Sequence, residues 1–94
     1  MIKPKIYHAT LTANTPYTFT FDVAGSYFIA KNLTTDTLSA SFGDAIDNDS
    51  HWLIPKNSMQ PLCSTLTSTE ETETDKITVQ STGSGIAEIQ ILEY

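Results

Sequence analysis

The 94-residue sequence contains no arginine, and its five lysines stand against eleven acidic residues, which gives a net charge of −6. Because nucleic-acid backbones bind basic surfaces, DNA and RNA are not expected partners. The single cysteine, Cys63, excludes an intramolecular disulfide and a zinc site built on several thiolates. The apolar runs are far shorter than the ~20 residues that cross a bilayer, so no membrane-spanning segment is expected. The N-terminus also lacks the apolar stretch of a secretory signal.

The length allows one domain, spanning residues 1–94, because compact domains typically hold ~100–150 residues. A domain of this size without disulfides has a small core, and contacts between copies would bury additional apolar surface. Self-association is therefore expected from size alone.

Fifteen threonines and nine serines favour strands over helices, since threonine is β-branched and suits a half-buried pleated surface. Residues 17–23 alternate strictly, with Tyr, Phe, Phe and Val on one face and Thr, Thr and Asp on the other. Residues 6–12 and 38–42 alternate in the same way. Residues 26–31 are apolar on both faces, which predicts a central, most buried strand that is covered on both sides.

Turn residues recur every eight to twelve positions, as in sandwiches and barrels. Residues 77–80 and 86–92 flank a glycine-bearing connection, which predicts an antiparallel hairpin. Pro55 and Pro61 interrupt two short strands and predict that these lie at edges or bends, because proline cannot donate to a ladder. The sequence thus predicts an all-β fold, a single antiparallel β-sandwich or jelly roll of seven or eight short strands. The longest polar stretches, 43–50 and 67–75, are expected to be exposed loops.

Catalytic patterns are absent from the sequence. No Gly-x-Ser-x-Gly elbow occurs, and Ser84 lies between two glycines in the connection that separates two predicted strands. No phosphate-binding glycine loop is present. Cys63 has apolar neighbours, as a small core residue would. We therefore expect no enzymatic activity and no cofactor.

A short acidic loop offers oxygen atoms of the kind that calcium binds, in Asp44, Asp47 and Asp49, with His51 following. The loop lacks the glycine and the closing glutamate of the helix-loop-helix calcium pattern. A solvated loop is the favoured interpretation, and no metal site is assigned.

Trp52 is the only tryptophan and follows this acidic loop. Small β-sandwiches often bind sugars through exposed aromatic rings, so Trp52 is the stacking residue of an alternative function, a small carbohydrate-binding or host-surface adhesion module. The run Trp52-Leu53-Ile54 favours a core position for the indole instead.

The order of the predicted strands resembles that of the small β-sandwich structural proteins of tailed-bacteriophage virions. The resemblance lies in residues 14–19 (NTPYTF), 27–33 (YFIAKNL), 52–57 (WLIPKN), 77–81 (ITVQS) and 85–89 (GIAEI). It implies a non-enzymatic capsid decoration, head-completion or tail-associated subunit, localised in a virion that is assembled in the host cytoplasm. The implied partners are copies of the protein and other virion proteins.

Two oppositely charged segments are candidates for contacts between copies. Residues 1–6 are expected to form an extended N-terminal arm that docks on the acidic stretch of a neighbouring copy, although a frayed terminus and a solvated loop explain the same sequences. The candidate interface residues are Ile2, Lys3, Lys5, Glu70, Glu71, Glu73 and Asp75.

Overall fold

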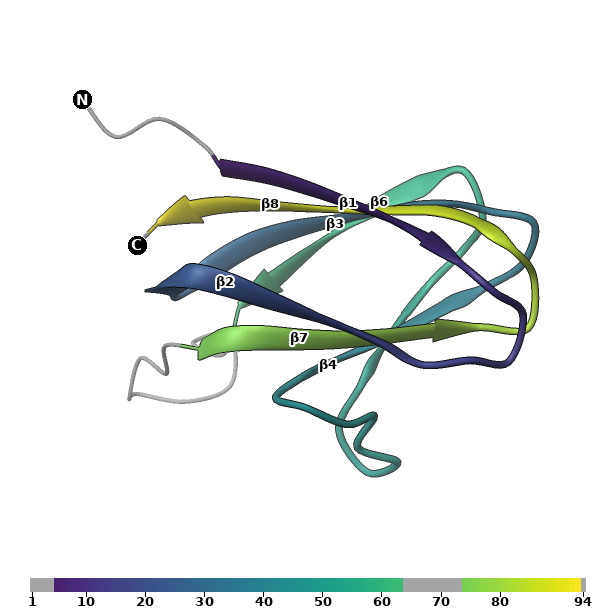
Figure 1. Ribbon diagram of the computed structural model, residues 1–94, viewed down its shortest axis with the longest axis horizontal. Coiled ribbons are helices and arrows are strands. Elements are labelled where there is room, and N and C mark those ends of the chain that lie inside the picture. The colour runs from purple at the N-terminus through teal and green to yellow at the C-terminus, as the bar shows by residue number, and fades with distance from the viewer. Residues whose placement is uncertain (1–4, 64–73, 94) are drawn as a thin grey trace.

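The computed structural model describes residues 5–63 and 74–93, and these residues form eight β-strands (Figure 1). The strands are β1 (Lys5–Leu11), β2 (Tyr17–Gly25), β3 (Tyr27–Thr34), β4 (Leu38–Phe42), β5 (Trp52–Ile54), β6 (Ser58–Cys63), β7 (Thr74–Ser81) and β8 (Gly85–Glu93). Every pair of neighbouring strands is antiparallel. Within the described ranges there is no helix that could cross a lipid bilayer.

The strands form two four-stranded sheets that pack face to face. Sheet A has the order β1-β8-β3-β6, and sheet B has the order β2-β7-β4-β5. The chain behaves as one long hairpin that has been rolled up, because β4 pairs with β5, β3 with β6, β2 with β7 and β1 with β8. This is the strand order of a jelly roll. The predicted all-β sandwich or jelly roll is therefore confirmed.

The predicted hairpin of residues 77–80 with 86–92 is wrong. Strand β7 lies in sheet B between β2 and β4, whereas β8 lies in sheet A between β1 and β3. The short connection crosses from one sheet to the other. Each strand has one apolar face, and two such strands can bury their faces by lying opposite each other across the core as well as by pairing edge to edge. Periodicity does not distinguish these two arrangements.

Gly85 begins β8 at a place where the chain makes a close approach. Its φ angle is +139°, and a Cβ atom there would lie 2.7 Å from the Leu33 carbonyl oxygen and 2.9 Å from the Thr34 Cα. Glycine is the residue that fits both the backbone angle and the missing space. The crossing between the sheets thus depends on this position.

The core lies between the sheets and takes alternate residues from nearly every strand. Its buried members are Leu11, Phe19, Phe21, Phe28, Ala30, Leu38, Ala40, Ile54, Leu62, Ile77, Val79, Ala87, Ile89 and Ile91. A line of touching aromatic rings runs through it, from Tyr7 through Phe21, Phe28 and Phe42 to Trp52, with ring centroids 4.9 to 5.7 Å apart. These spacings suit aromatic contacts and connect the edge strand of one sheet with the edge strand of the other.

Strand β3 is central in sheet A, as predicted, but it is not fully covered on both faces. Phe28 and Ala30 point into the core and are completely buried, whereas Ile29 on the outer face is half-buried. The outer face of β3 therefore has an apolar side chain that the rest of the described structure leaves partly exposed to solvent.

The prediction that the two prolines mark edge strands or bends is confirmed. Pro61 lies in β6 and Pro55 follows β5, and these strands form the edges of sheets A and B.

Asn32 is a fully buried polar residue at the end of β3. Its Nδ2 donates to the carbonyl oxygens of Asp36 (2.8 Å) and Ile54 (2.9 Å), and its Oδ1 accepts from the amide (2.9 Å) and hydroxyl (2.6 Å) of Thr34. One amide thus joins β3 of sheet A to β5 of sheet B and to the turn that follows β3. All of its hydrogen-bonding capacity is used.

Candidate functional site

The structure places two residues of the predicted N-terminal arm inside a strand. Lys5 and Ile6 belong to β1 and pair with Ile91 and Gln90 of β8, so for these two residues the arm prediction is wrong. Backbone pairing with β8 includes the last two residues of the predicted arm. Asp75 lies exposed in β7. The other predicted interface residues lie outside the described ranges, namely Ile2, Lys3, Glu70, Glu71 and Glu73.

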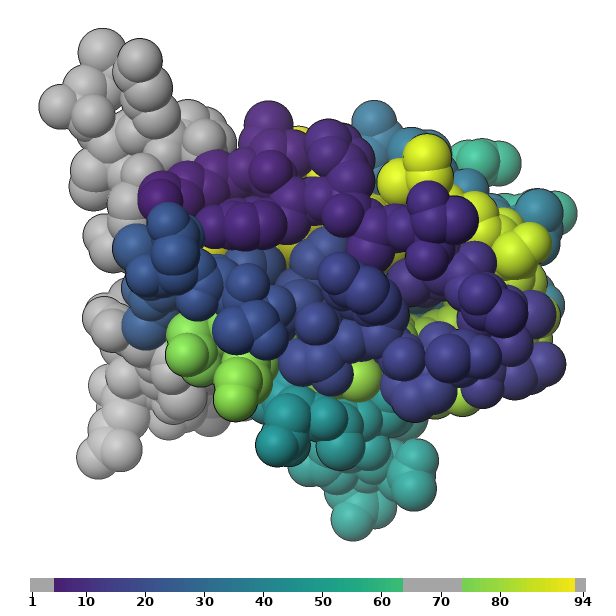
Figure 2. All heavy atoms as spheres, viewed as in Figure 1, coloured from purple at the N-terminus to yellow at the C-terminus, as the bar shows by residue number. Residues whose placement is uncertain are grey.

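Lys5 takes part in a contact that joins the two sheets within one molecule. Its Nζ lies 3.0 Å from Asp22 Oδ2, and the Tyr7 hydroxyl donates to Asp22 Oδ1 at 2.6 Å. Two hydrogen bonds hold the pKa of Asp22 below its usual value, and the bond from Tyr7 has a larger effect than the bond from Lys5. The bond between Tyr7 and Asp22 also raises the pKa of Tyr7. Figure 2 shows β1 in purple lying beside β2 in dark blue on this side of the molecule.

Trp52 packs against the core, as the favoured interpretation predicted. It faces inward on β5, opposite Ala40 of β4, and its ring lies 5.1 Å from that of Phe42. The indole is partly buried by this contact. Trp52 therefore does not present a free stacking face of the kind that the carbohydrate-binding alternative assigned to it.

The two histidines and the cysteine, whose side chains could act as a base or a nucleophile, lie apart in the described structure. His8 projects from β1 in sheet A and bonds to Glu88, whereas His51 lies beside sheet B, and Cys63 is buried at the end of β6. Among residues 5–63 and 74–93, no three His, Cys, Asp or Glu side chains converge as metal ligands would. Asp47 organises its loop instead, with Oδ1 accepting from the Asp49 amide at 2.9 Å.

The outer face of sheet A is the first candidate binding surface, and we call it the sheet A face. Four of its apolar side chains are strongly exposed, with exposed fractions of 53% for Ile6, 43% for Leu33, 60% for Met59 and 42% for Ile86. Leu33 and Ile86 lie directly opposite each other in neighbouring strands. Sequence reasoning missed this surface, because its exposed residues come from four strands that only the sheet brings together.

A row of charged side chains crosses the sheet A face. His8 Nε2 lies 2.8 Å from Glu88 Oε1, and Glu88 is the register partner of Lys31. Gln90 Nε2 donates to Glu88 Oε2 at 3.0 Å. This bond from Gln90, with that from His8, lowers the pKa of Glu88 and keeps it ionised. The row therefore presents an acid between two basic groups, with the exposed apolar side chains around it.

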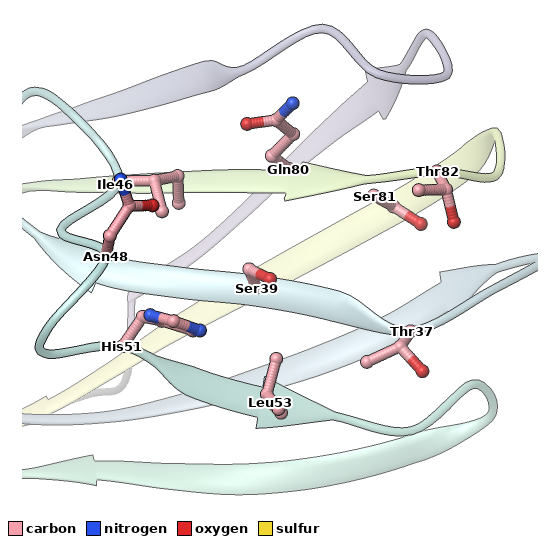
Figure 3. Close-up of a pocket in the computed structure, with 9 residues that line it drawn as sticks. All are labelled: Thr37, Ser39, Ile46, Asn48, His51, Leu53, Gln80, Ser81 and Thr82. Carbon is pink, nitrogen blue, oxygen red and sulfur yellow. The ribbon is translucent and has the colours of Figure 1, made fainter.

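A hollow of about 360 Å³ lies on the outer face of sheet B, and we call it the sheet B hollow (Figure 3). The loop of residues 43–51 forms one wall, and β4, β5 and the end of β7 form the floor and the other wall. The lining residues are Thr37, Ser39, Ile46, Asn48, His51, Leu53, Gln80, Ser81 and Thr82. Figure 2 shows the loop, in teal, projecting from the body of the sandwich.

Comparisons with models of protein families, with curated proteins and with solved structures find no match to this chain.

Proposed function

We propose that this protein is a non-enzymatic structural subunit that assembles with copies of itself through the sheet A face, as a component of a tailed-phage virion. The resemblance of its strand order to small virion proteins and its jelly-roll topology, which is common among viral capsid domains, support the virion assignment. The observation that supports assembly most directly is the apolar character of the sheet A face.

An apolar surface of this kind favours association. Monomeric proteins tolerate scattered exposed apolar residues, whereas contiguous patches mark interaction sites. Leu33 and Ile86 lie directly opposite each other in neighbouring strands, and Ile6 and Met59 lie on the two edge strands of the same sheet. Each of these four residues is 42% exposed or more. Burial of these side chains against a partner would remove apolar area from water at about 25 cal/mol per Å².

The charge pattern makes a second copy the fitting partner. The chain as a whole has a net charge of −6, which opposes association, but the sheet A face sets Lys31 beside Glu88. A two-fold axis that passes between these residues brings Lys31 of each copy onto Glu88 of the other. Such a surface is complementary to itself, as an isologous interface requires. We infer a two-fold dimer as the basic unit of assembly.

The oligomeric mass tests this proposal. Light scattering after size exclusion should give a dimer for the wild type and a monomer for the double variant Leu33→Ser/Ile86→Ser. Leu53→Ser is the matched control, since Leu53 is 61% exposed but lies on the other sheet, and it should remain dimeric. A monomeric wild type, or a trimer, pentamer or hexamer unaffected by the double variant, contradicts the proposed interface.

Charge reversal provides a second test of the two-fold arrangement. Lys31→Glu alone and Glu88→Lys alone should each weaken the dimer, because each places like charges opposite one another across the axis. A mixture of the two variants should form mixed dimers. In one of the two symmetry-related contacts the native Lys31 of the Glu88→Lys copy meets the native Glu88 of the Lys31→Glu copy. In the other contact the two substituted residues meet, and their charges are again opposite. No association in the mixture, with both variants folded by circular dichroism, contradicts the proposed axis.

A further inference from the structure

The sheet B hollow has walls that are held in place before any ligand arrives. The Ser41 hydroxyl donates to the Ser50 carbonyl (3.2 Å) and accepts from the Asp47 amide (3.0 Å), which pins both ends of the loop turn to β4. The Thr78 hydroxyl donates to the Gly43 carbonyl at 2.9 Å. Ser41 and Thr78 are buried although they point outward from the sheet, because the loop covers them. A preformed wall lowers the ordering cost of binding.

Several polar groups in the hollow are available to a ligand. His51 Nδ1 lies 2.9 Å from the Asp47 carbonyl oxygen, and since a carbonyl only accepts, the neutral ring has its proton on Nδ1 and leaves Nε2 as an acceptor. Gln80 Nε2 donates to the Asn14 carbonyl at 3.3 Å, which leaves its Oε1 available. Within the described part of the chain, the side chains of Ser39 and Asn48 make no hydrogen bond.

The lining also specifies the charge and shape of the ligand. None of the nine described lining residues is an acid, a lysine or an arginine, while Asp44, Asp47 and Asp49 on the adjoining loop disfavour anions. Leu53, which is 61% exposed, and Ile46 add aliphatic surface to the same hollow. Its volume of about 360 Å³ lies in the range of ~300–1,000 Å³ that is usual for small-molecule sites.

The geometry points to the sheet B hollow as a binding site for a neutral saccharide unit. A sugar ring has hydroxyl groups that donate to His51 Nε2 and Gln80 Oε1 and that exchange hydrogen bonds with Ser39 and Asn48. Its C–H face packs on Leu53 in place of an aromatic ring. Because the sheet A face lies on the opposite sheet, this site is independent of the proposed assembly.

Nuclear magnetic resonance titration of the ¹⁵N-labelled protein tests the site. The probes are neutral hexoses, 6-deoxyhexoses and N-acetylhexosamines, with glucuronic acid and a sulfated hexose as anionic counterparts. We expect a neutral sugar to shift the amide signals of Ser39, Leu53 and Thr82 with a dissociation constant on the order of 1–10 mM. Gln80→Ala should weaken this binding about 3- to 10-fold, the effect of one hydrogen bond, and Ser39→Gln, which fills the floor, should remove it.

The control is Gln60→Ala, which deletes the same side chain from β6 in sheet A and should leave the affinity unchanged. Circular dichroism verifies that each variant is folded, and repetition with Leu33→Ser/Ile86→Ser separates sugar binding from assembly. The proposal is overturned if no neutral sugar causes shifts below about 50 mM, if the shifts map to the sheet A face, if Gln80→Ala and Ser39→Gln bind like the wild type, or if the anionic sugars bind more tightly.

Discussion

The buried amide of Asn32 offers the most direct test of how the two sheets are held together. Asn32→Ala removes four hydrogen bonds and leaves the carbonyl oxygens of Asp36 and Ile54 without the donor that they share in the native structure. At about 1 kcal/mol for each bond, with more where a buried group loses its partner, the expected loss is about 4 kcal/mol of unfolding free energy. A 94-residue domain has a total stability of roughly 5–14 kcal/mol.

Equilibrium unfolding in urea, followed by circular dichroism, measures this loss. The midpoint should fall sharply at an unchanged slope, and the melting temperature should decrease by roughly 15–30 °C. Asn48→Ala is the matched control, because its side chain is exposed and makes no hydrogen bond within the described residues, and it should change stability by less than about 0.5 kcal/mol.

A second variant separates the loss of hydrogen bonds from the loss of volume. Asn32→Asp keeps the shape of the side chain but replaces the donating Nδ2 with an oxygen that faces the carbonyls of Asp36 and Ile54. It should destabilise the protein about as much as Asn32→Ala. The argument is refuted if Asn32→Asp is tolerated, or if Asn32→Ala costs less than about 1 kcal/mol.

Two further perturbations test the contacts between the sheets. Tyr7→Phe should raise the pKa of Asp22 toward its usual value in a carboxyl titration followed by nuclear magnetic resonance. The ionised Asp22 stabilises the fold at a pH above its unfolded pKa, and this contribution is lost as the pH falls through its lower folded pKa. The variant should therefore lose less stability than the wild type on acidification. An unchanged pKa of Asp22 would contradict the role given to the bond from Tyr7. Gly85→Ala should reduce the free energy of unfolding by at least about 2 kcal/mol, because of both its φ angle and the close contact with Leu33. Gly43→Ala is the matched control: its φ angle is +101° but its Cβ would meet open space, so the loss should be about 1 kcal/mol. Equal losses of the two variants in urea unfolding would show that the contact with Leu33 is unimportant.

The strands themselves could be predicted from the sequence because their signals are local. Alternation in residues 17–23 predicted the inward-facing Phe19 and Phe21, and two prolines marked edge strands. The pairing of the strands could not be predicted, since β7 and β8 satisfy the same alternation whether they share a sheet or face each other across the core. Which arrangement forms depends on β1 and β2, which are distant in sequence.

The candidate surfaces were harder to find than the fold. The sheet B hollow combines residues 37–39, 46–53 and 80–82, and no short motif connects them. The exposed Leu33 and Ile86 meet only through the register of β3 with β8. Apolar residues on both faces of residues 26–31 were correctly recognised, but they were attributed to cover from within the chain. In the structure the outer-facing Ile29 is only half-buried, and the proposed dimer would cover it further.

The rolled arrangement of the chain also determines when the fold can be completed. Strand β1 pairs with β8, and Lys5 lies opposite Ile91, so β1 is synthesised long before the strand with which it pairs. Sheets built on such distant contacts close slowly. Until β8 is made, β1 has no neighbouring strand and β3 has one unpaired edge, and both can recruit strands from other nascent chains. Premature termination before Gly85 should therefore produce aggregates rather than a smaller soluble domain.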